Sequence, residues 1–477
     1  MSSLLRFVVD CGGRKGFFFF TYERYRAKNR GIQNAAPTRA RVKMHMKLRF
    51  TVGCVFPLLL AACTLYRPQP VNLLRNTAEW KLVSARLCED GSAMSLPKMH
   101  EIGLLLNPEL NQARLAFARS SVMAEFAGLW EDPSLSADLA QVREIGATNR
   151  GIGLSLTLPV TGLPSLAEKV AACYKEADYL EMVKQEREYL VKLDVLRYRV
   201  MATHAKQELM ETRVKRMVEE QKSAQRMHEL GEMDFADFQV ICRRLNDGQK
   251  ELQEMEQEHL ELHLELVRLL GLHPDTRNVE IAGQLPSSIP TAVPEAPYDM
   301  LRQHPAVLAA MAAHRTSEAE LEREIRKQYP ELSVNPGFEH EDGNSKVGIG
   351  IGVNLPLWNR NKQGIAEAVM ERGIKEYDAV QTWRALMQQS VALYDMQELL
   401  LKHCRAEKER VAQLSDAEQK QEKLYAIGET KLPAVADARQ EAYLRRLNYL
   451  DCLTKLLTTQ VELQYLQLPT IIFYFSK

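Results

Sequence analysis

The feature that most constrains the fold of this chain is an internal duplication. Four landmarks in the sequence recur with a constant separation of 197 residues. The pairs are Asn107-Pro108 with His304-Pro305, Asp132-Pro133-Ser134-Leu135-Ser136 with Tyr329-Pro330-Glu331-Leu332-Ser333, Leu158-Pro159 with Leu355-Pro356, and Leu230-Gly231-Glu232 with Ile427-Gly428-Glu429. Because a fixed period indicates repeated structural units, we predict two repeats, at 98–275 and 295–470, joined by a proline-containing linker at 276–294.

Both repeats predict the same order of elements: a helix, two short strands, a very long helix and a closing helix. The first helix is expected over 108–130 and 305–328, the long helix over 164–231 and 362–428, and the closing helix over 233–271 and 432–467. The segment 184–270 is rich in Glu, Lys, Leu, Arg, Gln and Met and has no proline, as coiled-coil helices do. At about 1.5 Å per residue, the long helix should reach roughly 100 Å, which is more than a globular domain needs.

The predicted strands alternate between apolar and small or polar residues. The apolar set is Ile152, Leu154 and Leu156 in the first repeat and Val347, Ile349, Ile351 and Val353 in the second. A period of two gives each strand one apolar face, which fits either a half-buried strand of a soluble sheet or a transmembrane strand facing lipid. The polar segments 144–150 and 341–346 are expected to be the hairpin loops. Four strands cannot close a barrel in lipid, so transmembrane strands would require oligomerisation.

The charge of the chain is balanced overall but unevenly placed. The whole chain has 62 Lys+Arg and 62 Asp+Glu, which gives no reason to expect a nucleic-acid partner. Its mean hydropathy of −0.29 excludes a membrane protein with many helical spans. Residues 1–45 hold ten basic and two acidic residues, whereas the chain after residue 62 holds 50 basic and 60 acidic residues.

The basic front end contains a secretory signal. Met46-Lys47-Leu48-Arg49 is followed by an apolar run over 50–60 and then by Leu60-Ala61-Ala62-Cys63. A run of eleven residues is too short to span a bilayer as a helix but suits a signal peptide. The small residues before a cysteine are similar to a bacterial lipobox, so we expect 46–62 to be a lipoprotein signal peptide and Cys63 to be lipidated. The segment 1–45 is then a leader or a mis-assigned upstream extension, 63–97 a tether and 471–477 a tail.

No pattern in the sequence indicates an enzyme, a cofactor or a metal. The run Gly348-Ile349-Gly350-Ile351-Gly352 has the wrong spacing for a dinucleotide loop, and no Walker motif, nucleophile elbow or HExxH is present. His259 and His263 have helical spacing for a shared cation, but the sequence shows no third ligand nearby, so an exposed helix face is the simpler interpretation. The five cysteines after Cys63 are far apart in sequence, which predicts solitary buried thiols.

Taken in order, these landmarks resemble the TolC family of outer-membrane efflux proteins over 63–470, in its lipidated branch. The resemblance rests on Asn107-Pro108-Glu109-Leu110, His304-Pro305-Ala306-Val307, Tyr329-Pro330-Glu331-Leu332-Ser333, Val353-Asn354-Leu355-Pro356-Leu357-Trp358-Asn359 with Gly364, and the two glycine turns. It implies an α+β membrane protein with four transmembrane strands per chain. Three chains would close a twelve-stranded barrel that continues into an α-barrel of long antiparallel coiled-coil helices.

The resemblance also implies where partners and gating residues lie. The turns at Gly231-Glu232 and Gly428-Glu429 would form a periplasmic tip that docks on a periplasmic adaptor (membrane fusion) protein, itself bound to an inner-membrane pump. Asp437 matches an acidic position of the closed entrance, Ala434 occupies a second such position, and Asp234 and Asp237 are further candidates for the constriction. The run at 356–361 is somewhat similar to the branch of the family that exports divalent cations.

We therefore expect a passive outer-membrane exit duct, present as a homotrimer in contact with outer-membrane lipid and serving a tripartite efflux or type I secretion system. One alternative is a periplasmic coiled-coil lipoprotein with a structural or interaction role and no conducting pore. Another is a degenerate member of the family that no longer conducts.

Overall fold

The computed structural model describes residues 66–88, 93–142, 147–276, 279–341 and 344–468. The chain divides into two units, Met1–Asn76 and Thr77–Lys477, and every contact discussed below lies within the second unit. Within the described ranges, no helix is both long and apolar enough to cross a bilayer. The predicted signal peptide, Cys63 and the tail at 471–477 lie outside the described residues.

The helices and strands follow one another in the predicted order, twice. After α2 (Leu73–Cys88) and α3 (Leu96–Leu106), the first series is α4 (Pro108–Glu125), β1 (Ser134–Val142), β2 (Ala147–Leu158), α5 (Leu163–Glu229) and α6 (Phe235–Leu269). After the short α7 (Tyr298–Leu301), the second series is α8 (Pro305–Arg326), β3 (Leu332–Glu341), β4 (Asn344–Val353), α9 (Lys362–Ala426) and α10 (Leu432–Gln467).

The first helix of each series begins with a capping side chain followed by proline. Asn107 accepts a hydrogen bond from the backbone N–H of Leu110 at 3.1 Å, and the ring of His304 accepts one from the N–H of Ala306 at 3.3 Å. Proline then fits the first helical position, because it has no N–H to leave unpaired there. Asn107 and His304 therefore start α4 and α8 at equivalent points of the two series.

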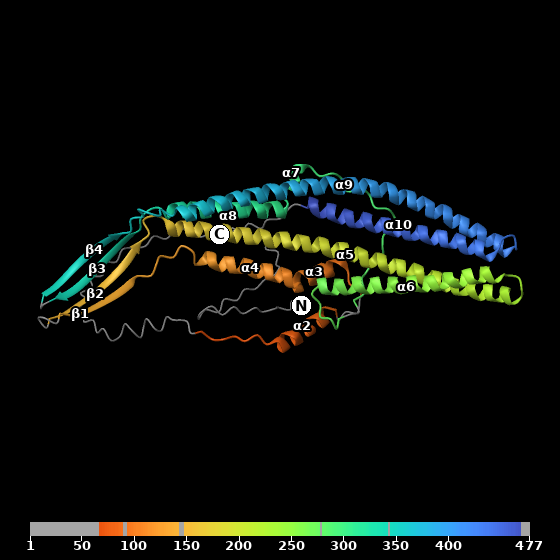
Figure 1. Ribbon diagram of the computed structural model, residues 1–477, viewed down its shortest axis with the longest axis horizontal. Helices are drawn as coiled ribbons and strands as arrows, with labels where there is room; N and C mark the ends of the chain where they lie inside the picture. The colour runs from red at the N-terminus through yellow and green to blue at the C-terminus, as the bar shows by residue number, and fades with distance from the viewer. Residues whose placement is uncertain (1–65, 89–92, 143–146, 277–278, 342–343, 469–477) are drawn as a thin grey trace, which may run out of the picture. The chain divides into compact units, whose positions relative to one another are not determined.

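The four strands form one antiparallel sheet in the order β1-β2-β3-β4, so the two hairpins pair through β2 and β3 (Figure 1). The strands extend further than the sequence suggested. Asn149 and Arg150 belong to β2, and Lys346 belongs to β4 and pairs with Glu339, so the expected loops at 144–150 and 341–346 are wrong in extent. The physical reason is that an antiparallel backbone ladder continues past the last apolar residue, whatever the polarity of the side chains.

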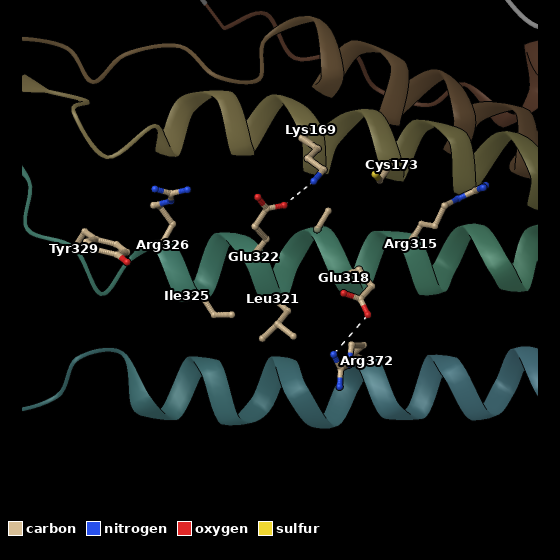
Figure 2. Close-up of a pocket in the computed structure, with 11 residues that line it drawn as sticks. Lys169, Cys173, Arg315, Glu318, Leu321, Glu322, Ile325, Arg326, Tyr329 and Arg372 are labelled. Carbon is tan, nitrogen blue, oxygen red and sulfur yellow. Dashed lines mark hydrogen bonds and ion pairs between the residues drawn. The ribbon is translucent and has the colours of Figure 1, made fainter.

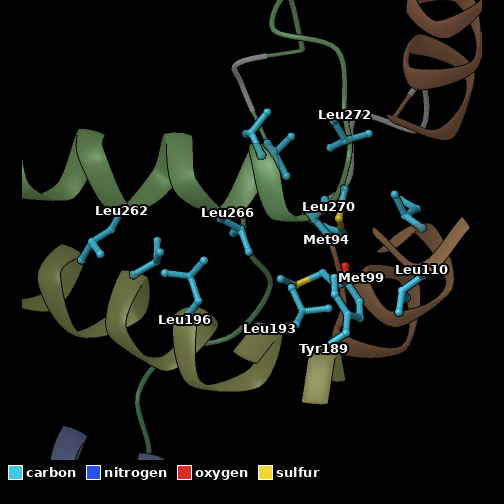
Figure 3. Packing of buried hydrophobic residues seen from close by; sticks show 14 residues of the cluster. Met94, Met99, Leu110, Tyr189, Leu193, Leu196, Leu262, Leu266, Leu270 and Leu272 are labelled. Carbon is cyan, nitrogen blue, oxygen red and sulfur yellow. The ribbon is translucent and has the colours of Figure 1, made fainter. Parts of the chain in front are cut away.

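The long helices pack as two antiparallel pairs. Helix α5 lies along α6 and α9 lies along α10, and the two series contact each other where α5 meets α8 and α10 (Figure 1). A shared apolar cluster forms where α3, α4, α5 and α6 meet, and Figure 3 shows Met99, Leu110, Tyr189, Leu193 and Leu266 within it. The Tyr189 hydroxyl donates to the carbonyl of Leu269 at 3.2 Å. This cluster fixes the end of α6 against the middle of α5.

Candidate functional site

One face of the sheet collects its apolar side chains. Residues paired directly across an antiparallel ladder project to the same side, and the register aligns Ile152 with Phe338 and Phe338 with Val347. The next apolar row aligns Leu156 with Val334 and Val334 with Ile351. The seven residues expected to face lipid therefore lie on one surface of the sheet.

The opposite face is built mainly from glycine and small polar residues, and Asp138, Glu339 and Lys346 add a charged row to it. One row across it is Ser136, Gly153, Gly337 and Gly348, and another contains Thr157, Ser333 and Gly352. A β-carbon added at Gly348 would have no neighbour within 4 Å, so the face is open at this position. The two faces thus differ sharply in polarity and in bulk.

The apolar face is uncovered. The side chains of Val347, Ile349 and Ile351 are 84%, 74% and 73% exposed, and in the described part of the chain no helix packs extensively on either face of the sheet. A soluble half-buried sheet would cover its apolar side, because exposed contiguous apolar surface is unfavourable in water. The outer edges of β1 and β4 are the two ends of the sheet.

The second region of interest is the pair of tight turns that join the long helices. Both turns end their first helix with the same hydrogen bonds: Glu232 N–H to the carbonyl of Met227 at 2.8 Å, and Glu429 N–H to that of Leu424 at 2.9 Å. Gly231 and Gly428 directly precede these two glutamates and have φ values of +77° and +81°. Side chains other than glycine rarely adopt this left-handed conformation, which reverses the chain within a few residues.

The turns are packed against each other and expose apolar side chains. Met233 and Ile241 share a buried cluster with Leu432, so the α5–α6 turn contacts the start of α10. Leu230 and Ile427, which directly precede the two glycines, are nevertheless 74% and 68% exposed. This region, defined by 227–238 and 424–435 and called the tip below, offers an apolar surface at equivalent points of the two repeats.

Asp437 joins the two helix pairs close to the tip. Its carboxylate, on α10, forms an ion pair with the guanidinium of Arg244 on α6, and the aspartate side chain stays largely exposed. The structure therefore brings the expected constriction residue into contact with the other helix pair. Arg244 was missed in the sequence because it lies 193 residues from Asp437.

The other two acidic candidates have a local role. The carboxylate of Asp234 accepts the backbone N–H of Asp237 at 2.8 Å and caps the start of α6. Asp237 lies in the first turn of α6, where a negative charge is favourable beside the helix N-terminus. Neither forms a described contact with α9 or α10, whereas Asp437 connects the two helix pairs directly.

A buried polar network above the tip strengthens the connection between the helix pairs. Arg439 on α10 donates to Glu220 on α5 at 2.6 Å and to Glu422 on α9 at 2.8 Å. Burial lowers the pKa of Arg439, but these two hydrogen bonds outweigh burial and raise the pKa overall, so the side chain remains positively charged. Arg213 on α5 donates to the carbonyl of Arg439 at 3.2 Å and lies over the ring of Tyr443. The network was not visible in the sequence, because Arg213 and Arg439 are 226 residues apart.

A groove of about 690 Å³ lies between α5, α8 and α9 (Figure 2). Its charged side chains are paired with one another: Lys169 with Glu322 at 2.6 Å and Arg372 with Glu318 at 3.6 Å. The guanidinium of Arg326 lies over the ring of Tyr329. Arg315 pairs with Glu176 outside the groove at 2.7 Å, so most of the charged side chains that line the groove are already paired.

His259 and His263, which lie four residues apart on α6, have His204 as a third histidine nearby. The ring of His259 lies 5.6 Å from that of His204 on α5 and 6.2 Å from that of His263. Burial, together with the two neighbouring rings, lowers the pKa of His259. In the ranges that the structure covers, no three His, Cys, Asp or Glu side chains are arranged to hold a metal ion.

Residues 296–466 match the model of a protein family described as outer membrane efflux protein. Over these residues the chain is similar to outer membrane efflux proteins. The match contains the His-Pro helix start, the second strand pair and the second tip turn, and it confirms the resemblance drawn from those residues. No curated protein matches the chain in sequence.

Solved structures show that the efflux-family fold extends over most of the chain. VceC from Vibrio cholerae has a TM-score of 0.65 at 14% identity, covering 78% of this chain and 96% of its own. The CmeC outer membrane channel of Campylobacter jejuni has a TM-score of 0.67 at 13% identity, covering 78% and 85%. The open-state MtrE outer membrane channel of Neisseria gonorrhoeae has a TM-score of 0.64 at 14% identity, covering 78% and 88%. At such identities these likenesses establish the fold.

Proposed function

We propose that the protein is an outer-membrane efflux channel, the passive exit duct of a tripartite efflux or type I secretion system. The observation that carries the proposal is the two-faced sheet. Its apolar face, with Val347, Ile349 and Ile351, is exposed, and its other face is lined by glycine and small polar side chains. An apolar exterior around a polar interior is the arrangement of a transmembrane barrel.

Closure of the barrel requires further chains. Strands of 9 to 12 residues match the length that spans a bilayer at a tilt. A closed membrane barrel needs at least about eight strands, and open edges are not tolerated in lipid. We propose a homotrimer in which β4 of one chain pairs with β1 of the next, giving twelve strands.

The long helices supply the periplasmic part of the duct. Helix α5 has 67 residues and α9 has 65, and each runs from the sheet to the tip. At about 1.5 Å per residue, each covers roughly 100 Å, enough to carry a tunnel well beyond the membrane. We propose that the exposed apolar residues of the tip, with Gly231, Glu232, Gly428 and Glu429 forming its turns, dock on a periplasmic adaptor bound to an inner-membrane pump.

The domain organisation of the proposal follows the duplication. Residues 46–62 direct export, a lipid on Cys63 anchors the mature chain to the outer membrane, and 63–97 is a tether. The efflux repeats at 98–275 and 295–470 form the barrel and tunnel, with 276–294 as linker. Segments 1–45 and 471–477 are an extension and a tail.

Site-directed labelling of β4 tests the proposal. In a background that keeps Cys63 but lacks the five cysteines after it, Ile349→Cys and Ile351→Cys should react with a maleimide dissolved in the lipid, because their side chains face the acyl chains. The matched positions on the other face, Gly350→Cys and Gly352→Cys, should react only with a water-soluble maleimide that enters the lumen.

The alternation of labelling separates the channel from the alternative. If all four cysteines reacted equally with the water-soluble reagent, β4 would be a strand in water. The chain would then fit a periplasmic coiled-coil lipoprotein without a pore.

A further inference from the structure

Two of the cysteines described by the structure lie side by side. Cys404 is on α9 and Cys452 is on α10, 48 residues further along the chain, and the antiparallel packing of these helices brings them together. Cys404 belongs to the buried cluster formed with Leu400 and Leu456, and Cys452 packs against the same cluster. The expectation of five solitary thiols is therefore wrong for this pair. The sequence alone does not show which residues of two antiparallel helices face each other.

The contacts of the two sulfur atoms place them within reach of each other. The thiol of Cys452 donates to the carbonyl of Leu400, one helical turn before Cys404, with a sulfur–oxygen distance of 3.7 Å. Burial, and then the nearby Cys404 and Cys452 thiols, raise the pKa of Tyr449, which lies one turn before Cys452.

The two thiols differ in accessibility. Cys404 is fully buried, whereas Cys452 is only partly buried. Burial is the first cause that raises the pKa of the Cys404 thiol, and the neighbouring Cys452 thiol raises it further. The thiolate is the reactive form, and the raised pKa of Cys404 disfavours it there. Cys452 is also the more accessible sulfur, so an incoming reagent reaches it first.

We propose that Cys404 and Cys452 are a disulfide-forming site that links α9 to α10. The proposal rests on the proposed function in one respect: the helices must lie in the periplasm, where disulfides form and persist. The oxidant is a thiol–disulfide oxidoreductase or another disulfide of that compartment.

The reaction balances through two exchanges. The Cys452 thiolate attacks one sulfur of the oxidant's disulfide, forming a mixed disulfide and releasing the oxidant's other sulfur as a thiolate. The Cys404 sulfur then attacks Cys452, forming the Cys404–Cys452 bond and releasing the second oxidant sulfur. The two protons lost by the cysteines end on the oxidant's thiols, so the cysteines are oxidised and the oxidant is reduced.

The bond has a mechanical consequence for the tip. It closes a loop that contains Gly428, Asp437 and the whole α9–α10 turn. With α9 fixed to α10 above the turn, movement at the tip becomes movement of that hairpin as a unit against α5 and α6. The cysteines of the other pair, Cys173 on α5 and Cys242 on α6, lie close to opposite ends of their hairpin and offer no such link.

Thiol counting on protein taken from the bacterial envelope tests the proposal. N-ethylmaleimide is added at lysis, the full chain is denatured, and its intact mass and peptides are measured without reductant. We expect Cys88, Cys173 and Cys242 to be alkylated, and Cys404 and Cys452 to be recovered as one cross-linked peptide. Cys404→Ser should leave Cys452 free to react, while Cys242→Ser should leave the cross-link intact.

A second arm separates this inference from the proposed function. Purified reduced protein in detergent is incubated with oxidised glutathione as the probe. A cross-link formed there but missing from envelope protein supports the site and counts against the periplasmic location. The site is overturned if both cysteines are alkylated in envelope protein and the purified protein forms no Cys404–Cys452 peptide with oxidised glutathione.

Discussion

At the scale of single residues, the two repeats use different chemistry at equivalent positions. Asn107 caps α4 with a side chain that does not titrate, while His304 caps α8 with a ring nitrogen that must remain unprotonated to accept the N–H of Ala306. Burial, and secondarily the charge of Arg187, lower the pKa of His304 from 6.5 to about 4. The α8 cap is therefore sensitive to acid and the α4 cap is not.

The substitution His304→Asn should reduce the acid sensitivity of the fold. A depressed histidine pKa contributes stability that is fully present above the unfolded pKa of 6.5 and is lost as pH falls toward 4. The shift corresponds to at most about 3 kcal/mol by linkage. Thermal unfolding at pH 7.5 and pH 5 should show a smaller loss of Tm for His304→Asn than for the parent, with Asn107→Ala, which removes an uncharged cap, as the control. Equal losses in parent and His304→Asn would contradict the assignment.

A comparison of two glycines separates backbone strain from steric contact. Gly271, at the end of α6, has φ of +71°, and an added β-carbon would lie 2.6 Å from the carbonyl oxygen of Leu106. Gly428 has φ of +81° but no atom within 4 Å of such a carbon. Gly428→Ala should cost about 1 kcal/mol from strain alone, and Gly271→Ala distinctly more, because the Leu106 backbone must also move. Chemical denaturation would measure both, and equal costs would refute the steric argument.

At the scale of helices and strands, the sequence predicts elements better than contacts. Proline and glycine act locally, so the helix starts at Pro108 and Pro305 and the turns at Gly231 and Gly428 were predicted and are observed. The period-two pattern of β4 predicted the strand but not its polar beginning at Asn344. Side-chain polarity marks the buried or lipid-facing part of a strand, while the ladder follows backbone hydrogen bonds.

Contacts between distant segments had no local signal. Asp437 was a candidate from the sequence, but its partner Arg244 was not, and neither were the buried network at Arg439 or the contact between Cys404 and Cys452. Each depends on which face one long helix presents to another, over separations of 48 to 226 residues. A small error in helical phase would remove all of them.

The Asp437–Arg244 pair should affect opening more than folding. An exposed ion pair contributes about 0–1 kcal/mol to stability, so Asp437→Asn should unfold nearly as the parent does. Because the pair connects α6 with α10 beside the tip, its loss should raise the open probability of single channels. Arg244→Gln should have the same effect, and the double variant should add little to either.

A second ion pair is the control for this result. Lys206 on α5 and Asp451 on α10 also connect the helix pairs, but further from the tip. Asp451→Asn should leave the open probability near that of the parent. An equal increase for Asp451→Asn would mean that the tip contact has no special role in gating.

At the scale of the whole molecule, the glycine-rich face of the sheet is the proposed lining of the barrel. Gly350→Trp places a large side chain on that face and should lower single-channel conductance, because the narrow part of the barrel loses cross-section. Ile349→Trp, one residue away on the apolar face, should leave conductance nearly unchanged. Planar-bilayer recording of the two variants measures both conductances. A larger loss of conductance for Ile349→Trp would mean that the apolar face, and not the glycine-rich face, lines the lumen.

The most direct test of the central claim is the single-channel conductance of the purified protein in planar bilayers, with its oligomeric mass determined in the same detergent. The account predicts a trimer that inserts and produces discrete current steps, whose open probability increases in Asp437→Asn. A protein that stays monomeric and never produces steps would contradict the duct.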